Sequence, residues 1–295
     1  MNPAFDRSAE NLGSIVRFGH VNVNVPNPFM AQTFYVCALG LTRDPYAQTG
    51  IDNMWINVGQ SQFHLPTGDA TRLRGHTGIV MPDRAGLLKR LEQYAGQFAG
   101  TQFDFKAEGD HVAIRCPWGN RFRVYEPSPR FAPIWLGIAY LEFEVPHGVA
   151  AGIARFYERM LFAQATLADE GGARVAVVQA GQGQQMRFRE SAGEVPAYDG
   201  HHIQVYVSRF GETHALLEKA GLISQENTRF LYRFVKITDP DDGRLLYEIE
   251  HEVRSMTHPL FLRPQVNRNP AVGQREYQLG IPDDQWNGPP LLQPK

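Results

Sequence analysis

Three polar side chains that could do chemistry alternate with valines near the start of the chain. In FGHVNVNVP, residues 18–26, His20, Asn22 and Asn24 occupy every second position. This period of two predicts a strand with one apolar face and one polar face. A strand that faces solvent usually carries Thr, Ser, Lys or Glu, whereas an imidazole and two amides can ligate a metal or hydrogen-bond a substrate. The pattern raises the question of whether His20 faces solvent or the inside of a site.

Composition and charge restrict the class of protein that carries this strand. The chain has 295 residues, 43% of them hydrophobic and 20% charged, which is typical of a soluble globular protein and favours two domains. A net charge of −2 gives no electrostatic footprint for nucleic acid. Cys37 and Cys116 form no CxxC pair, which favours a reducing cytoplasm and argues against a disulfide framework or a thiolate zinc site. Neither a signal peptide nor a membrane-spanning run is apparent, so we expect a cytoplasmic protein that binds no membrane.

One order of elements, a strand, a helix and then further strands, occurs four times along the chain. The first strands of the four repeats are predicted at GHVNVNVP, RGHTGIVMPD, GIAYLEFEVP and GHHIQVYVS. Details repeat as well, since Phe156 and Tyr157 recur in the third repeat with the spacing of Phe34 and Tyr35 in the first. Four copies of one βαβββ repeat predict an internally repeated protein. Because two repeats are needed to curl a sheet into a cup, we expect two cups.

The repeats divide the chain into modules. We expect an N-terminal extension at 1–14, a first module of two repeats at 15–127, a Pro-rich linker at 128–135 and a second module of two repeats at 136–252. Residues 253–295 have many prolines and no sustained period. They are expected to form an extended tail that packs on its own domain or on a partner subunit.

The fourfold repeat and its local motifs resemble the vicinal oxygen chelate superfamily, which includes glyoxalases, extradiol dioxygenases and bleomycin-resistance proteins. GHVNVNVP and RGHTGIVMPD with their helices, and the endings PWGNRFRVYEP and DPDDGRLLYEIE, carry this resemblance. It implies an α+β fold in which the four βαβββ repeats form two half-open barrels of the glyoxalase/dioxygenase type. It also implies a small-molecule substrate and a homodimer. The fold alone does not select a function, because it supports isomerases, lyases, oxygenases and plain binders.

Carried onto the first module, the metal-ligand positions of the family fall on His20, His64, His76 and Arg123. The resemblance therefore implies a metal held by the three histidines, with Fe²⁺ favoured and Zn²⁺, Mn²⁺ or Ni²⁺ as alternatives. A guanidinium cannot ligate a metal, so Arg123 departs from the glutamate that is usual in the family. Its expected role is to bind an anionic group of the substrate. Other expected site residues of this cup are Arg121 and Asn22 for substrate binding and Tyr125 as a general acid.

The second module offers a different set at the matching positions. Tyr140, Arg187, His202 and Glu248 are the candidates there. His202 and Glu248 could supply two ligands of an Fe²⁺ site, but Tyr140 interrupts the third position. Asp242 in the turn leaves the strand register open by one residue, and such a slip would exchange His202 for His201. The preferred interpretation is a degenerate cup, in which Tyr140, Glu142, His202 and Glu248 form a hydrogen-bonded polar cluster.

Two functions of different classes follow. The first is a metal-dependent vicinal oxygen chelate enzyme, a ring-cleaving dioxygenase or a glyoxalase-like lyase or isomerase, that acts on a small, oxygenated and anionic substrate. The four-repeat chain slightly favours a dioxygenase. The alternative is a metal-free protein of the bleomycin-resistance type, which would bind and sequester a small molecule through arginines such as Arg187 and Arg189. Three histidines at ligand positions discriminate between the two, because a pure binder does not need them.

Overall fold

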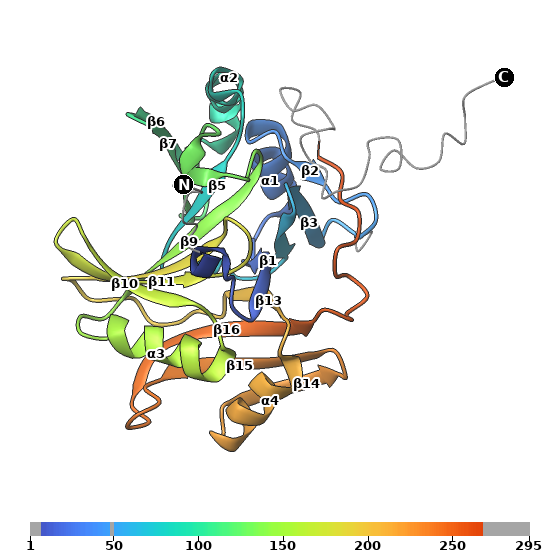
Figure 1. Ribbon diagram of the computed structural model, residues 1–295. Coiled ribbons are helices and arrows are strands. Elements are labelled where there is room, and N and C mark those ends of the chain that lie inside the picture. The colour runs from blue at the N-terminus through green and yellow to red at the C-terminus, as the bar shows by residue number, and fades with distance from the viewer. Residues whose placement is uncertain (1–6, 48–49, 268–295) are drawn as a thin grey trace, which may run out of the picture. The chain divides into compact units, whose positions relative to one another are not determined.

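The computed structural model describes residues 7–47 and 50–267. The four repeats appear in the predicted order (Figure 1). The first contains β1 (Ile15–Asn22), α1 (Pro28–Gln32), β2 (Thr42–Arg43), β3 (Asn53–Val58) and β4 (Ser61–Pro66). The second contains β5 (Gly75–Val80), α2 (Arg84–Tyr94), β6 (Asp104–Glu108), β7 (His111–Arg115) and β8 (Arg121–Tyr125). The third contains β9 (Gly137–Val145), α3 (Ala150–Leu161), β10 (Ala165–Glu170), β11 (Ala173–Gln179) and β12 (Gln185–Glu190). The fourth contains β13 (His202–Val207), α4 (Phe210–Lys219), β14 (Ile223–Thr228), β15 (Leu231–Thr238) and β16 (Leu245–Ser255).

Two eight-stranded mixed sheets, each cupped like a half-barrel, confirm the predicted α+β fold class. Their strand orders are β14-β15-β16-β13-β1-β4-β3-β2 and β10-β11-β12-β9-β5-β8-β7-β6. The expectation that the first two repeats share a cup is wrong. Strand β1 pairs antiparallel with β13, with Asn22 opposite His202, so the first repeat shares its sheet with the fourth. The second and third repeats share the other sheet.

Local sequence explains where the helices begin and end. Asn27 caps α1 by accepting a hydrogen bond from the backbone N–H of Met30 at 3.0 Å, and Pro28 occupies the first turn, where its missing N–H has no cost. The helix continues as a π-helical turn, Thr33–Ala38, and ends before Gly40, whose φ of 78° is easily reached only by glycine. The predicted helix of the first repeat is therefore observed, with a wider last turn.

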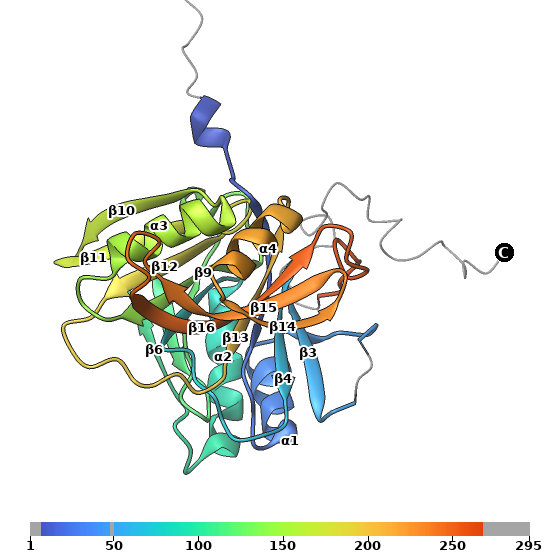
Figure 2. The same cartoon turned by 90° about the horizontal axis from the view of Figure 1, so that it is seen from below.

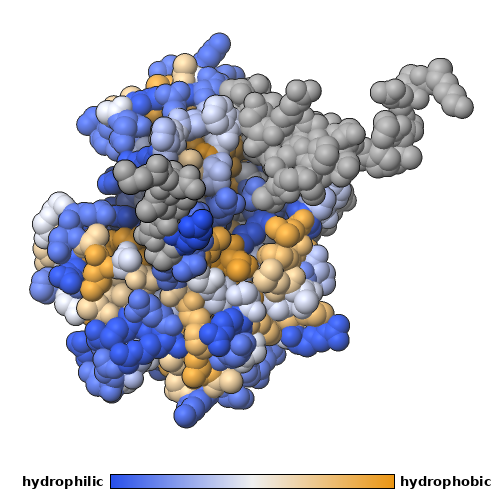
Figure 3. Space-filling view, viewed as in Figure 1, coloured by the Kyte–Doolittle hydropathy of each residue, from blue (hydrophilic) through white to orange (hydrophobic). Residues whose placement is uncertain are grey.

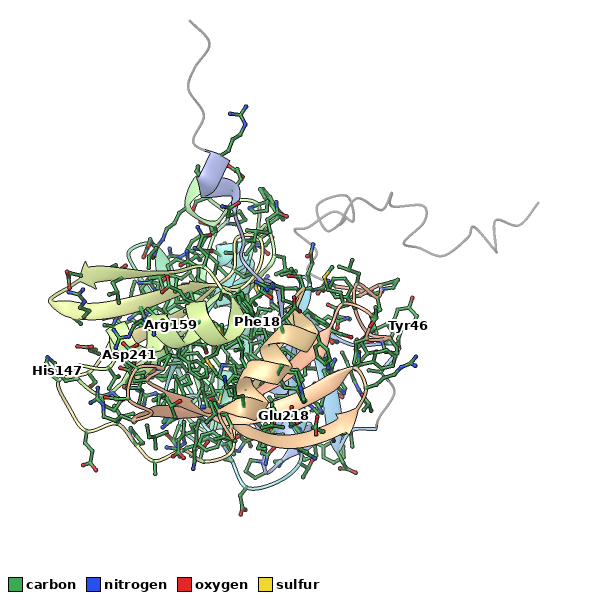
Figure 4. All side chains as sticks on the ribbon, turned by 60° about the horizontal axis from the view of Figure 1, so that its bottom comes forward. Phe18, Tyr46, His147, Arg159, Glu218 and Asp241 are labelled. Carbon is green, nitrogen blue, oxygen red and sulfur yellow. The ribbon has the colours of Figure 1, made fainter. Side chains whose placement is uncertain are left out.

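The chain divides into two compact units, each with its own core. The described part of the first unit consists of 7–22, 73–76 and 140–261, and that of the second unit of 23–47, 50–72, 77–139 and 262–267. In the first unit, helices α3 and α4 lie side by side and pack against the sheets (Figure 2). Arg159 on α3 pairs with Asp241 of the β15–β16 turn at 2.5 Å, and the two side chains are labelled in Figure 4. The module boundaries expected from the sequence stay a prediction.

The described part of the C-terminal tail is bound to the second unit. Arg263 pairs with the buried carboxylate of Asp44, and Asn57 donates a hydrogen bond to the Val266 carbonyl at 2.8 Å. The side chain of Asn267 both accepts from and donates to the backbone of Gly59, at 3.1 Å in each direction. Strand β16 continues to Ser255, and residues 268–295 lie outside the described range.

The outer surface is mixed in polarity. Hydrophilic residues make up most of the face seen in Figure 3, and apolar residues appear on it as separate patches. Within the described residues, none of the helices is long and apolar enough to cross a membrane.

Candidate metal centre and its counterpart

His20 and His202 lie on the paired strands β1 and β13 of the first unit. His20 is opposite Gln204 and Asn22 is opposite His202, so the polar positions of the two strands lie on alternate rungs of the ladder, with Val21 opposite Ile203 between them. Gly19 allows this close approach, because a Cβ at this position would lie 1.7 Å from the Gln204 side-chain oxygen. Both imidazoles are buried, at 2% and 8% exposure. His20 therefore does not face solvent, which answers the question raised by its strand.

The Nε2 atoms of His20 and His202 are 3.3 Å apart, and their rings are steeply inclined at 66°. Two imidazole nitrogens bound to one ion at about 2.1 Å, with an angle between the right angle and the tetrahedral value, would be about 3.0–3.4 Å apart. The observed spacing fits a shared transition-metal ion. Within the first unit, His20 and His202 are therefore the histidines that could share such an ion. We refer to this pair as the histidine centre.

His64 is fixed by its neighbours on β3 and β4. Its ring stacks on Trp55, with 3.9 Å between the ring centroids and 11° between the planes. Its Nε2 lies 2.5 Å from the side-chain oxygen of Asn53. An outer hydrogen-bond partner of this kind sets the orientation and the tautomer of an imidazole.

Two carboxylates of β16 stand behind His202. Glu250 Oε1 lies 3.5 Å from His202 Nδ1, and Glu252 Oε2 lies 3.8 Å from His202 Nε2. Glu250 is opposite His202 in the parallel ladder of β13 and β16. A carboxylate beside Nδ1 favours a proton on that nitrogen, so that Nε2 is the nitrogen suited to act as a metal ligand.

The opposite face of β16 belongs to the core of the first unit. His251, between the two glutamates in sequence, is fully buried and stacks on Phe234 with 4.3 Å between ring centroids. The Tyr157 hydroxyl lies 2.6 Å from His251 Nε2, while His251 Nδ1 donates to the Ile249 carbonyl at 2.9 Å. Burial lowers the pKa of His251 to about 4. It is a neutral core residue at physiological pH.

His76 was expected to join His20 and His64, and this was wrong. Its Nε2 lies 3.1 Å from the Tyr140 hydroxyl, and its Nδ1 lies 3.9 Å from the Glu142 carboxylate. The reason is the sheet order: β5 belongs to the sheet that contains β9, and His202 of the fourth repeat takes the place predicted for His76.

Arginines close this second polar cluster. Arg187 Nε lies 3.1 Å and Arg189 Nε 2.9 Å from the oxygens of Glu142, and both guanidinium groups also contact Glu170, at 2.5 and 3.1 Å. We call His76, Tyr140, Glu142, Glu170, Arg187 and Arg189 the tyrosine centre. Burial acts to raise the pKa of Glu142, but hydrogen bonds from Arg189 and Arg187 and the nearby His76 outweigh it, and the pKa lies below its usual range.

The other residues predicted for the first cup are dispersed. Asn22 is buried beside His20 on β1. Arg121 and Arg123 on β8 are exposed. The Tyr125 ring packs against Phe131, with 4.9 Å between centroids, and lies 5.2 Å from the ring of His111. Their predicted roles in substrate binding and acid catalysis stay predictions.

On β16 the carboxylates beside His202 are Glu250 and Glu252, whereas the prediction chose Glu248. The backbone carbonyl of Glu248 accepts a hydrogen bond from Arg74. His201 is fully buried and its Nδ1 contacts Asp199 at 2.6 Å, so the strand has not slipped. Glu252 was missed because the predicted strand motif, DPDDGRLLYEIE, ended at Glu250; the alternation of Glu252 with Glu250 in YEIEHEV is the signal that could have found it.

No model of a known protein family matches the sequence, and no curated protein sequence matches it. Solved structures are similar in fold. A putative dioxygenase from Bacillus subtilis subsp. subtilis str. 168 aligns with a TM-score of 0.56 and 14% identity, over 83% of this chain and 86% of that chain. Glyoxalase I from Zea mays aligns with a TM-score of 0.54 and 12% identity, over 82% of this chain and 92% of that one. Its E144Q mutant gives a TM-score of 0.56 and 13% identity, over 82% and 94%.

These similarities establish the fold. The resemblance to the vicinal oxygen chelate superfamily is confirmed at that level, because the matched glyoxalases share the arrangement over most of both chains. Identity of 12–14% carries no activity from those proteins to this one.

Proposed function

We propose that the protein is a metal-dependent enzyme of the vicinal oxygen chelate type, and that the histidine centre is its active site. The observation that carries this proposal is the convergence of two buried Nε2 atoms, those of His20 and His202, at 3.3 Å. This spacing is the one expected of two imidazole ligands that share one cation.

The donor set narrows the choice of metal and reaction. Neutral imidazole nitrogens suit Fe²⁺, Zn²⁺, Mn²⁺ or Ni²⁺, among which Fe²⁺ agrees with a dioxygenase and the others with a lyase or isomerase. A bound ion would supply Lewis acidity toward oxygen atoms of a small substrate. His20 and His202 would hold it, and Glu250 would orient His202. His64 stays a ligand expected from the sequence. Cytoplasmic location and a homodimer remain expectations from the sequence.

The alternative, a metal-free binder that uses arginines to hold an anion, receives less support. Arg187 and Arg189 are engaged by Glu142 and Glu170, so their charge is already balanced within the tyrosine centre. A ligand carboxylate would have to displace a buried glutamate to reach them.

Elemental analysis by plasma mass spectrometry tests the proposal. Wild-type protein, His202→Ala and the matched control His76→Ala would each be incubated with Fe²⁺, Zn²⁺ or Mn²⁺ and passed through a desalting column. We expect about one equivalent of metal in the wild type and in His76→Ala, and a loss of that metal in His202→Ala. Iron-loaded protein would then be assayed with catechols, and zinc-loaded protein with hemithioacetals. Absence of bound metal from the wild type under all three conditions would refute the proposal.

A further inference from the structure

The carboxylates behind His202 are neutralised by two arginines of the same unit. Arg233 on β15 contacts Glu250 through one terminal nitrogen and Glu252 through the other. Arg254 reaches the second oxygen of Glu252 at 2.6 Å. Two negative and two positive charges therefore cancel next to the histidine pair.

Both oxygens of Glu252 are thereby held by guanidinium groups. The Glu252 and Arg254 side chains are only 3% and 9% exposed, so these ion pairs are shielded from water. Arg233 is directly opposite Glu252 in the antiparallel ladder of β15 and β16, which fixes the guanidinium over the two carboxylates. Arg254 is anchored in turn by the Tyr206 hydroxyl at 3.4 Å.

A carboxylate in this state is a poor metal ligand. Oε2, the oxygen nearer His202, accepts a hydrogen bond from Arg233, and such a charge-assisted bond is about twice as strong as a neutral one; Oε1 forms an ion pair with Arg254. The 3.8 Å between Glu252 Oε2 and His202 Nε2 also exceeds the spacing of about 3.0–3.4 Å expected for neighbouring ligands of one ion.

We propose that Arg233 is a positioning residue that withholds Glu252 from the metal, so that an ion at the histidine centre is held by neutral imidazoles and favours a small organic anion as its further ligand. This inference rests on the proposed function. It assigns opposite tasks to two neighbouring glutamates: Glu250 orients the His202 imidazole, while Glu252 is kept paired. An ion held by imidazoles alone keeps its full double charge, and attraction to an anionic ligand follows.

Zinc titration calorimetry tests this role of Arg233 through zinc affinity rather than through enzyme activity. The proteins are the wild type, Arg233→Gln, Glu252→Gln, the double variant, and the control Arg155→Gln, whose arginine pairs with Asp239 and Asp241 on the outside of the same unit. We expect Arg233→Gln to bind Zn²⁺ about tenfold more tightly, because the released Glu252 becomes a ligand. Glu252→Gln and Arg155→Gln should change the affinity less than about twofold, and the double variant should lose the gain. Oxalate, as an anionic probe, should bind zinc-loaded Arg233→Gln about tenfold more weakly than the zinc-loaded wild type.

The outcomes separate the inference from the proposed function. A tenfold loss of zinc affinity in Glu252→Gln would mean that Glu252 is already a ligand, and it would overturn the inference about Arg233. An unchanged or weakened zinc affinity in Arg233→Gln would overturn it as well. Either result leaves the proposed enzyme intact. Failure of the wild type to bind any metal would overturn both. Circular dichroism checks that each variant is folded, and Arg233→Lys, which keeps one charge without the fork, should give an intermediate affinity.

Discussion

The histidine centre and the tyrosine centre occupy the same strand positions in the two pairs of repeats, yet their polar side chains are arranged differently. In the first, imidazole nitrogens converge and the arginines stand behind, paired with Glu250 and Glu252. In the second, the Tyr140 hydroxyl faces His76, and Arg187 and Arg189 turn inward onto Glu142. The first arrangement brings two imidazole nitrogens together, while the second pairs guanidinium groups with a carboxylate.

The difference shows how two copies of one fold can carry different polar clusters at matching positions. A buried carboxylate has to be compensated by nearby positive charge. In the tyrosine centre the compensating arginines come from β12, directly beside Glu142 on β9 in the parallel ladder. Arg187 and Arg189 place two positive charges beside His76 and Tyr140, which disfavours a cation there.

The largest expected effect comes from breaking the tyrosine centre. Glu142→Gln would leave the guanidinium groups of Arg187 and Arg189 partly uncompensated, and removing one partner of a buried ion pair costs about 3–5 kcal/mol in the free energy of unfolding. Urea denaturation followed by circular dichroism measures this loss. Glu170→Gln is the matched control: its side chain is 41% exposed, so its loss should be about 1 kcal/mol or less. Equal losses in the two variants would show that burial does not distinguish the two carboxylates.

The two centres should contribute to the loss of stability in acid over different pH ranges. Behind the histidine centre, His251 is neutral in the folded chain down to pH about 4, whereas in the unfolded chain it binds a proton from pH about 6.5. Between these values the unfolded state binds more protons, so stability falls as the pH falls, by about 3 kcal/mol over the whole window. Unfolding free energies measured from pH 7.5 to 4 give the slope. His251→Gln, which cannot titrate but can accept from the Tyr157 hydroxyl, should flatten it.

The tyrosine centre responds in a lower window. The pKa of Glu142 is below its ordinary value of 4.5, so its ion pairs stabilise the folded state above that value and are lost as the pH falls through the folded pKa. The wild type should therefore lose stability below pH about 4.5 more steeply than Glu142→Gln. A common slope for the two proteins in that range would contradict the ionised state of Glu142 in the fold.

Local sequence patterns predicted the elements and the polar faces, but not which repeats pair. The alternation that placed His20 on one face of a strand needs only neighbouring residues, and it was confirmed by the 2% exposure of that side chain. The pairing of β1 with β13 joins positions such as His20 and His202, which are 182 residues apart. No local pattern distinguishes the first strand of the second repeat from that of the fourth, because RGHTGIV and GHHIQVY both present a histidine after a glycine.

The choice of Glu248 rather than Glu250 and Glu252 on β16 has a different physical origin. A one-residue change of register exchanges the two faces of a strand, and the turn containing Asp242 left that register open. The two faces of β16 differ sharply, since Glu250 and Glu252 line the histidine centre while His251 lies in the core. The long-range ladder with β13 fixes the register, by setting Glu250 opposite His202.

The smallest expected effect tests the orienting role of Glu250. Glu250→Gln keeps the shape of the side chain but removes the charge that lies 3.5 Å from His202 Nδ1. Loss of an outer carboxylate partner typically lowers metal affinity 10–100-fold, and because Arg233 would still hold Glu252 we expect the lower end, about tenfold. Zinc titration calorimetry measures the change. Glu170→Gln, which alters the tyrosine centre, should leave zinc affinity unchanged. Equal zinc affinities of Glu250→Gln and Glu170→Gln would mean that Glu250 does not orient His202. The two centres would then differ in their imidazoles alone, and the carboxylates of β16 would only balance the charge of Arg233 and Arg254.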